Sequence, residues 1–368
     1  MTHPFILESQ EAIHQAIQSK DPLRITGSGT KDWYGAELKG HPLSTKGYHG
    51  IINYQPDELV ITVRAGTSIK EVELALEEKS QQFAFEPPHF GDNATIGGMV
   101  CSGLAGPGRV SAGSLRDFVL GAKIMDGQGQ IMNFGGTVMK NVAGYDVSRL
   151  MPGSLGTLSL LLDVSIKVLP KPVATASLRL EIEQQKAIHM MNVLASQPWP
   201  INASCWQGEQ NGILHIRLSG AKAAVESATN AFKKNFGMQL LEPEEAKKFW
   251  SSLREQQSDW FQAGASQSLP LWRFAVAPTS NPLKLPGSTL IEWHGGQRWW
   301  HGHLDALTAK VIAAESHGHA SMFKSSKKDI AMLSSLSDNP LTKALVPVQE
   351  RLKKAFDPHG VFATGRLA

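Results

Sequence analysis

Glycine-rich turns are the part of this sequence whose residue types and spacing point most clearly to chemistry. Between Glu86 and Pro170 the chain holds far more than its share of the 34 glycines, set at turns between short apolar segments. Glycine loses the most backbone freedom on folding, so a dense cluster is expected where the backbone turns sharply or approaches a ligand closely. This stretch therefore predicts a binding site for a large, flat ligand that carries a pyrophosphate.

Four turns combine glycine with small polar residues, at 27–31, 93–100, 113–117 and 153–157. In the first, Gly-Ser-Gly-Thr-Lys, consecutive backbone N–H groups can form a concave nest for phosphate oxygens. In the second, two adjacent glycines at the start of a short apolar helix would let a ring or a pyrophosphate approach the positive helix end. Each turn alone is about equally compatible with ligand binding and with a purely structural role, as a simple tight turn or a site of close packing. The four together favour a ligand.

The spacing of these glycines excludes two common nucleotide sites. No helical pattern follows the turn at 27–31 and the G-x-G-x-x-G spacing is absent there, which argues against a Rossmann fingerprint. The Walker pattern G-x-x-x-x-G-K-[ST] is also missing. The predicted dinucleotide site is therefore of a different kind.

Other side chains that could do chemistry are fewer. Arg273 lies in a predicted strand, where its guanidinium could clamp a carboxylate, although a structural ion pair explains it equally well. His317 and His319 could place two imidazoles together, but a metal site needs a further ligand, and a solvated or hydrogen-bonded role is favoured. No metal site is predicted. The pair Trp299-Trp300, if exposed, would suit a subunit interface.

Composition places the chain in a broad class. Its 368 residues predict two domains, and its net charge of +3, without runs of like charge, argues against nucleic acid as a main partner. No segment approaches 18 uninterrupted apolar residues, and the N-terminus does not read as a secretory signal. With only Cys101 and Cys205, a disulfide framework or a cysteine-ligated iron–sulfur cluster is not expected. These features predict a soluble, cytoplasmic protein.

Elements that could position the turns can be read from periodicity. In the first part we expect helices over 9–20 and from the capping box at Ser68 onward, and strands at 23–26, 58–64, 83–86, 118–125, 130–134 and 157–169. After Pro170 the order strand, helix, two strands, helix, strand over 177–241 is the ferredoxin-like order. Further strands at 271–277 and 289–293 and helices at 243–257, 304–316 and 339–356 extend it.

The order of the four turns resembles that of FAD-binding domains of the vanillyl-alcohol-oxidase (PCMH) type. Within that superfamily, EPPHFGDNATIGGMV, GSLRDFVLG and VMKNVAGYDVSRLMPGS are similar to the FAD-binding subunits of glycolate oxidases, the GlcE family. The later stretches LWRFAVAP, GHASMF and DPHGVF resemble it too. The resemblance covers nearly the whole chain and is strongest over 84–170.

This resemblance implies an α+β fold, in which a two-subdomain PCMH-type FAD-binding domain carries a ferredoxin-like α+β cap domain. The expected boundaries are 1–170 for the FAD domain, 171–338 for the cap, and 339–368 for a C-terminal segment that packs back on the FAD domain. The residues expected to hold the cofactor are Gly27, Ser28, Gly29, Thr30, Lys31, Pro88, Thr95, Gly97, Gly98, Ser114, Asp117, Gly153, Ser154, Gly156 and Ile166. Family members that bind flavin covalently often carry histidine where this chain has Thr30, so non-covalent FAD is expected.

Three departures from the pattern bear on catalysis. Catalytic relatives read Gly-Ser-Glu-Gly where this chain has Leu155, and they carry a His-x-x-Gly-Asp-Gly-Asn-x-His cluster that is absent here. The usual Asn-Pro-Gly-Arg ending is Ala-Thr-Gly-Arg at 363–366, which alters only a terminal turn. The first two departures put an independent dehydrogenase activity in doubt.

The resemblance therefore implies the FAD-binding subunit of a glycolate dehydrogenase complex. That complex would oxidise glycolate to glyoxylate and pass electrons to an iron–sulfur subunit and quinone, with substrate oxidation assigned mainly to a catalytic FAD subunit. Any attachment to the inner membrane would come from these partners. Two alternatives stay open: a stand-alone flavin-dependent 2-hydroxy-acid dehydrogenase with Arg273 and His319 as catalytic residues, and a flavin-free assembly subunit.

Overall fold

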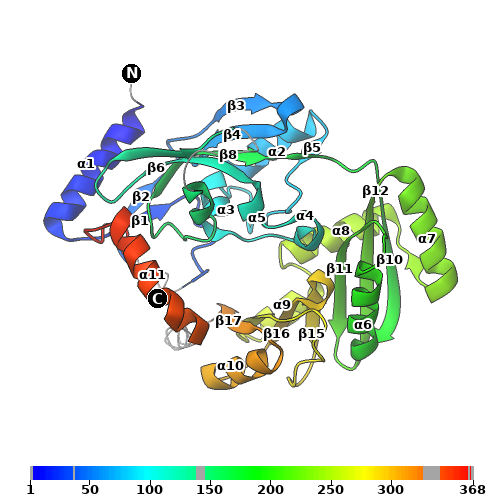
Figure 1. Cartoon of the computed structure of the whole chain (residues 1–368). Coiled ribbons are helices and arrows are strands. Elements are labelled where there is room, and N and C mark those ends of the chain that lie inside the picture. Colours follow the sequence, from blue (N-terminus) through cyan, green and yellow to red (C-terminus); the bar gives the residue numbers. More distant parts are fainter. Residues whose placement is uncertain (1–2, 36–37, 138–145, 326–339, 364, 366–368) are drawn as a thin grey trace. The chain divides into compact units, whose positions relative to one another are not determined.

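The computed structural model describes residues 3–35, 38–137, 146–325, 340–363 and 365 (Figure 1). The chain divides into two compact units. Unit 1 comprises Met1–Leu104, Ser114–Pro170 and Ser337–Ala368, and unit 2 comprises Ala105–Gly113 and Lys171–Leu336. The expected first domain, 1–170, is thus interrupted by a short excursion that groups with unit 2.

Unit 1 is built on a five-stranded antiparallel sheet in the order β3-β4-β8-β6-β7. Its strands are β3 (Ile51–Gln55), β4 (Val60–Arg64), β6 (Val119–Met125), β7 (Ile131–Gly135) and β8 (Leu160–Lys167). Beside it, β1 (Leu23–Thr26) pairs in parallel with β2 (His41–Ser44), and β5 (Gln81–Gln82) pairs with β9 (Leu169–Pro170). The central strand β8 is buried at most positions, which explains its nearly continuous apolar sequence.

The helices of unit 1 begin and end at recognisable signals. They are α1 (Pro4–Ser19), α2 (Ile69–Glu77), α3 (Ile96–Ser102), α5 (Leu115–Phe118) and α11 (Pro340–Phe356), with 3-10 turns η1 (Pro56–Glu58) and η2 (Val147–Leu150). The predicted cap of α2 is confirmed, because the Ser68 hydroxyl accepts from the N–H of Glu71 at 3.0 Å. Helix α1 begins earlier than predicted, since Pro4 stands in its first turn and His3 caps it.

Two strand predictions in unit 1 have opposite outcomes. The hairpin is confirmed as β6 and β7, closed by an Asp126 carboxylate that accepts from the N–H groups of Gln128 and Gln130. The strand expected at 83–86 is wrong, because these residues form a turn after β5. Phe83 and Phe85 are nevertheless buried, so their alternation reports packing of a turn on the core.

Unit 2 contains an eight-stranded sheet in the order β13-β10-β12-β11-β15-β16-β14-β17, antiparallel throughout. Its first half is β10 (Ala174–Glu183), α6 (Gln184–Ala195), β11 (Ile201–Gly208), β12 (Asn211–Gly220), α7 (Lys222–Phe236) and β13 (Gln239–Leu240). This confirms the ferredoxin-like order of elements. Helices α6 and α7 cover one face of these strands (Figure 1), with Met191, Trp206 and Phe232 in the shared core.

The second half of unit 2 extends the sheet. It consists of α8 (Pro243–Arg254), α9 (Asp259–Ser266), β14 (Leu271–Ala275), β15 (Thr289–Glu292), η3 (Trp293–Gly295), β16 (Gln297–His301), α10 (Ala306–Glu315) and β17 (His319–Lys324), and the excursion adds α4 (Arg109–Ala112). Trp299 and Trp300 are buried, each at most 5% exposed, so the condition for a role at a subunit interface is not met. Their indoles donate to Glu292 and to the carbonyl of Pro286, which makes them core residues. Among the described residues, no helix is long and apolar enough to cross a membrane.

Candidate FAD site

A cleft in unit 1 gathers the first two glycine turns. It has an empty volume of about 680 Å³ and opens to solvent. Its lining includes all of residues 27–31, together with Thr95, Gly97 and Gly98 at the start of α3 and Gly156 after η2. Segments far apart in the sequence therefore meet at one site.

The turn at 27–31 follows β1 directly and presents backbone donors. In the part of the chain that the structure describes, the N–H groups of Ser28, Gly29 and Thr30 donate no hydrogen bond to a protein acceptor. Gly29 adopts a φ of +80°, which favours glycine over any other residue. Unpaired backbone donors in a turn of this kind are suited to phosphate oxygens.

Helix α3 closes one side of the cleft. Thr95 caps it, with its Oγ1 accepting from the N–H of Gly98 at 3.2 Å. Two glycines allow close approach there: a Cβ on Gly27 would lie 2.3 Å from Thr95 Oγ1, and a Cβ on Gly97 would lie 2.9 Å from the Cβ of Ala65. A larger residue at Gly27 would separate the turn from the cap of α3, and one at Gly97 would separate α3 from Ala65 at the end of β4.

The segment 153–159 contributes another wall of the cleft, at 155–159, where Leu155, Gly156 and Ser159 line it. It is held to α3 because the N–H of Gly153 donates to the carbonyl of Val100 at 3.2 Å and that of Leu155 donates to Cys101 at 2.8 Å. Leu155, with a φ of +52°, lines the cleft beside Gly156. The position where catalytic relatives carry glutamate thus presents an apolar side chain.

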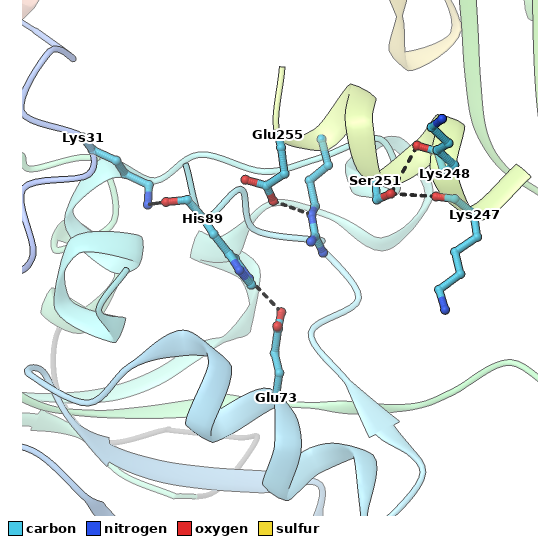
Figure 2. Close-up of polar contacts among 8 residues, drawn as sticks. Lys31, Glu73, His89, Lys247, Lys248, Ser251 and Glu255 are labelled. Atoms are coloured by element: carbon cyan, nitrogen blue, oxygen red, sulfur yellow. Dashed lines mark hydrogen bonds and ion pairs between the residues drawn. The ribbon is translucent and has the colours of Figure 1, made fainter. Parts of the chain in front are cut away.

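Lys31 is fixed at the end of the turn rather than free in solvent. It is 8% exposed, and its ammonium donates to the carbonyl of His89 at 3.0 Å and lies 5.6 Å from the centre of the Phe90 ring. Figure 2 shows this contact and the next one, in which His89 Nε2 meets Glu73 Oε1 at 3.1 Å. The loop after β5 is therefore tied both to the turn and to α2.

The other residues expected at the cofactor do not line this cleft. They are Pro88, Ser114, Asp117, Gly153, Ser154 and Ile166. Ser114 and Asp117 satisfy each other in the cap of α5, where the Asp117 carboxylate accepts from the N–H and the hydroxyl of Ser114. Ile166 is fully buried between β4 and β6, so its contribution is to the sheet beneath the site.

Sequence reasoning did not single out several residues that line the cleft. They are Ile25, Thr26, Asp32, Tyr34, Thr45, Ala65, Cys101, Ser102, Ser159 and Leu161. Some flank the glycine turns and could have been found by extending each turn by a few residues. Thr45 could not, because it reaches the site only through the pairing of β2 with β1, where its N–H and hydroxyl donate to the carbonyl of Thr26.

The expected catalytic pair lies in unit 2. Arg273 on β14 pairs with Ser321, and His319 on β17 pairs with Ala275, so both side chains stand on the same sheet face. Burial lowers the pKa of His319, and the charge of Arg273 lowers it further. Arg273 also lies over the ring of Phe323, at 5.3 Å. The structure thus places the two residues as neighbours. Within the described ranges, no group of three or more histidine, cysteine or acidic residues has the arrangement of a metal site.

The features of the cleft fit FAD. A pyrophosphate requires donors, which the turn at 27–31 supplies. The start of α3 does not add donors as expected, because the N–H groups of Ile96 and Gly97 donate to the carbonyls of Thr67 and Ala65 and that of Gly98 donates to Thr95 Oγ1. A flat ring requires walls that approach closely, which Gly97, Gly98 and Gly156 permit because they carry no side chain.

Comparisons with known proteins agree with this geometry. Residues 6–135 match the family described as FAD binding domain. The chain is 43% identical over 360 residues to the glycolate oxidase subunit GlcE of Escherichia coli, which covers 97% of this chain and 95% of that protein. It is 32% identical over 153 residues to the glycolate oxidase subunit GlcD of Bacillus subtilis, covering 41% of this chain and 32% of that one.

Solved structures show the same fold at low identity. The 4-ethylphenol oxidase of Gulosibacter chungangensis superposes with a TM-score of 0.68 at 11% identity, covering 98% of this chain and 87% of that chain. At this identity the likeness concerns the fold alone. The fold is the α+β architecture of PCMH-type flavoproteins, as the sequence predicted.

Proposed function

The chain belongs to the GlcE family of glycolate oxidase subunits, and from this premise we propose that it is the FAD-binding subunit of a complex that oxidises glycolate to glyoxylate. It is an FAD-dependent oxidoreductase subunit. The observation that carries the proposal is the 43% identity to GlcE over 97% of this chain, because the match extends through both units and not only the FAD-binding segment. The flavin-free alternative is not favoured by these comparisons.

In this proposal the chain's own residues bind and orient the cofactor. The N–H groups of residues 28–30 bind the pyrophosphate, and Leu155 and Leu161 supply apolar walls that keep water away. FAD, when bound, supplies the capacity to accept two electrons from the substrate. It is held non-covalently, with Thr30 in the turn.

We assign substrate oxidation mainly to a catalytic FAD subunit of the same complex. The supporting observation is local: Leu155 lines the cleft with an apolar side chain, so it offers no acid or base there. Electrons then pass to an iron–sulfur subunit and quinone. The complex is cytoplasmic, and any membrane attachment comes from partner subunits.

The division of labour is tested with the purified chain and the reconstituted complex. Glycolate-dependent reduction of an artificial electron acceptor is measured for the chain alone, the complex, and the complex without this chain. We expect FAD in the isolated chain, but turnover only in the full complex. Equal rates for the isolated chain and the complex would show that the division is wrong.

The placement of FAD in the cleft is tested separately with Ser28→Asp. A carboxylate beside the unpaired N–H groups repels a pyrophosphate without filling the space that the ring occupies. We expect this variant to lose FAD while Ser28→Ala, the matched control, retains it. A wild-type FAD content in Ser28→Asp would show that FAD does not bind in this cleft.

One observation favours a second candidate, a dehydrogenase site within unit 2. Arg273 and His319 share a sheet face, and the lowered pKa of His319 keeps its imidazole neutral, as a base requires. If this site acts on substrate, Arg273→Ala and His319→Ala will each abolish turnover of the complex with unchanged FAD content. His317→Ala, which alters an exposed neighbour, is the control. Unchanged turnover in the first two variants would eliminate this candidate.

A further inference from the structure

An ion pair between a buried aspartate and a half-buried lysine lies outside the cleft, at the end of α11. Asp357 is 3% exposed, and its carboxylate accepts from the Lys353 ammonium one helical turn earlier. It also accepts from the N–H of Val361 at 2.7 Å and from that of Phe362 at 2.8 Å. Buried charges are stable only when paired and fully hydrogen-bonded, and this carboxylate meets both conditions.

The lysine of the pair contacts one wall of the cleft. Lys353 Nζ donates to the carbonyl of Thr157 at 2.6 Å. Thr157 closes the turn of segment 153–159, because its N–H and its hydroxyl both donate to the carbonyl of Ser154. Two residues just before Thr157, Leu155 and Gly156, line the cleft.

The aspartate of the pair connects to the turn at 27–31 through the C-terminal tail. By holding the N–H groups of residues 361 and 362, it fixes the tail so that the carbonyl of Val361 accepts from the N–H of Leu23 at 2.7 Å. Leu23, Val361 and Phe362 also share one apolar cluster and are at most 7% exposed. Leu23 is the first residue of β1, and β1 leads directly into the turn at 27–31.

The surroundings of Asp357 leave little freedom for this arrangement. The N–H of Gly127, in the β6–β7 hairpin, donates to the carbonyl of Phe356 at 2.8 Å. A Cβ at Gly127 would lie 2.2 Å from Asp357 Oδ1, so the hairpin and the helix end touch directly. The ion pair is therefore held against the central sheet of unit 1.

We propose that Lys353 and Asp357 are positioning residues for FAD, which fix the spacing between the turn at 27–31 and the wall at 155–159. The proposal rests on the proposed placement of the cofactor in this cleft. Neither side chain is among the residues that line the cleft, so both act through other residues. Without the pair, the turn at 27–31 and the wall at 155–159 are no longer held through α11 and the tail, and FAD binds a less organised site.

The test measures FAD affinity and folding stability in the same variants. The purified full-length chain is stripped of flavin and titrated with FAD, well below the melting temperature of each variant. Lys353→Met removes the cation at similar length, and Lys353→Arg preserves it. Lys354→Met alters the adjacent, exposed lysine of the same helix and is the matched control.

We expect Lys353→Met to raise the Kd for FAD about tenfold or more, in line with the loss of a charged hydrogen bond. Lys353→Arg should recover most of the affinity, and Lys354→Met should match the wild type. Asp357→Asn should weaken FAD binding further. A lower melting temperature with unchanged FAD affinity in Lys353→Met would overturn the proposal, because the pair would then serve stability alone.

Failure of the underlying placement gives a different result. If Ser28→Asp binds FAD as the wild type does, the cofactor does not lie in this cleft. If Ser28→Asp loses FAD while Lys353→Met retains full affinity, FAD binds in this cleft but Lys353 and Asp357 do not position it.

Discussion

Stability of unit 2 should fall as the pH drops from about 6.5 to 4, because His215 is buried in its neutral form. The side chain is 6% exposed on β12, and its ring stacks on Phe249 at 3.9 Å with 22° between the planes. Burial, followed by the charge of Arg179, lowers the pKa of His215 from 6.5 to about 4. No hydrogen-bond partner for its Nδ1 lies among the described residues, so nothing compensates a proton at that atom.

The sign follows from which state binds the proton. Above pH 6.5 the imidazole is neutral in both states, and stability does not depend on this group. Between pH 6.5 and about 4 the unfolded chain binds a proton that the folded chain does not, so the free energy of unfolding decreases as the pH decreases. At about 1.4 kcal/mol per pH unit the full effect is about 3 kcal/mol, of which about 2 kcal/mol is reached at pH 5.

The assay is urea unfolding followed by tryptophan fluorescence at pH 7 and pH 5. His215→Phe keeps an aromatic ring against Phe249 without a titratable group, and His189→Gln, on the exposed side of α6, is the control. We expect the wild type and the control to lose about 2 kcal/mol more than His215→Phe between these pH values. An equal loss in all three proteins, or a measured pKa of His215 near 6.5 in the folded chain, would refute this reasoning.

Two further substitutions test other features of the structure. Gly27→Val places a Cβ against Thr95 Oγ1, which should disrupt the cap on Gly98 and abolish FAD binding, measured by flavin content; full flavin content would contradict the close approach of the turn to α3. Arg298→Met removes a fully buried guanidinium that donates to three backbone carbonyls, and should cost at least about 2 kcal/mol in urea unfolding, whereas Lys284→Met, in an exposed ion pair, should cost under about 1 kcal/mol. Similar small costs for both substitutions would show that the three hydrogen bonds of Arg298 contribute little to stability.

Local signals in the sequence were enough for many elements. The alternation from Leu158 to Val168 predicted β8, and Ser68 predicted the start of α2, since both depend on periodicity or on a cap within one turn of chain. The ferredoxin-like order in unit 2 was likewise readable, because each helix and strand there has its own pattern. Strands β16 and β17 were not predicted, because β16 is buried at nearly every position and β17 at only two adjacent ones, so neither shows an alternating pattern.

The expected cofactor residues divide in the same way. The turn at 27–31 and the pair Gly97-Gly98 were found because glycine density is a property of the sequence, and both line the cleft. The turn that contains Ser114 and Asp117 is also rich in small polar residues, but the polar groups of these two residues hydrogen-bond to each other in the cap of α5. A small-polar turn cannot reveal by itself whether its donors and acceptors are consumed locally.

The sequence by itself determined the kind of ligand, because glycine spacing excluded the Rossmann and Walker sites and matched a flavin-binding family. Only the tertiary structure decided which turns meet. It brings the N–H groups after β1, the cap of α3 and the wall at 155–159 together through contacts between distant segments, and it supports them through Lys353 and Asp357 near the other end of the chain. Those contacts depend on how strands pair and helices pack, which no local pattern encodes.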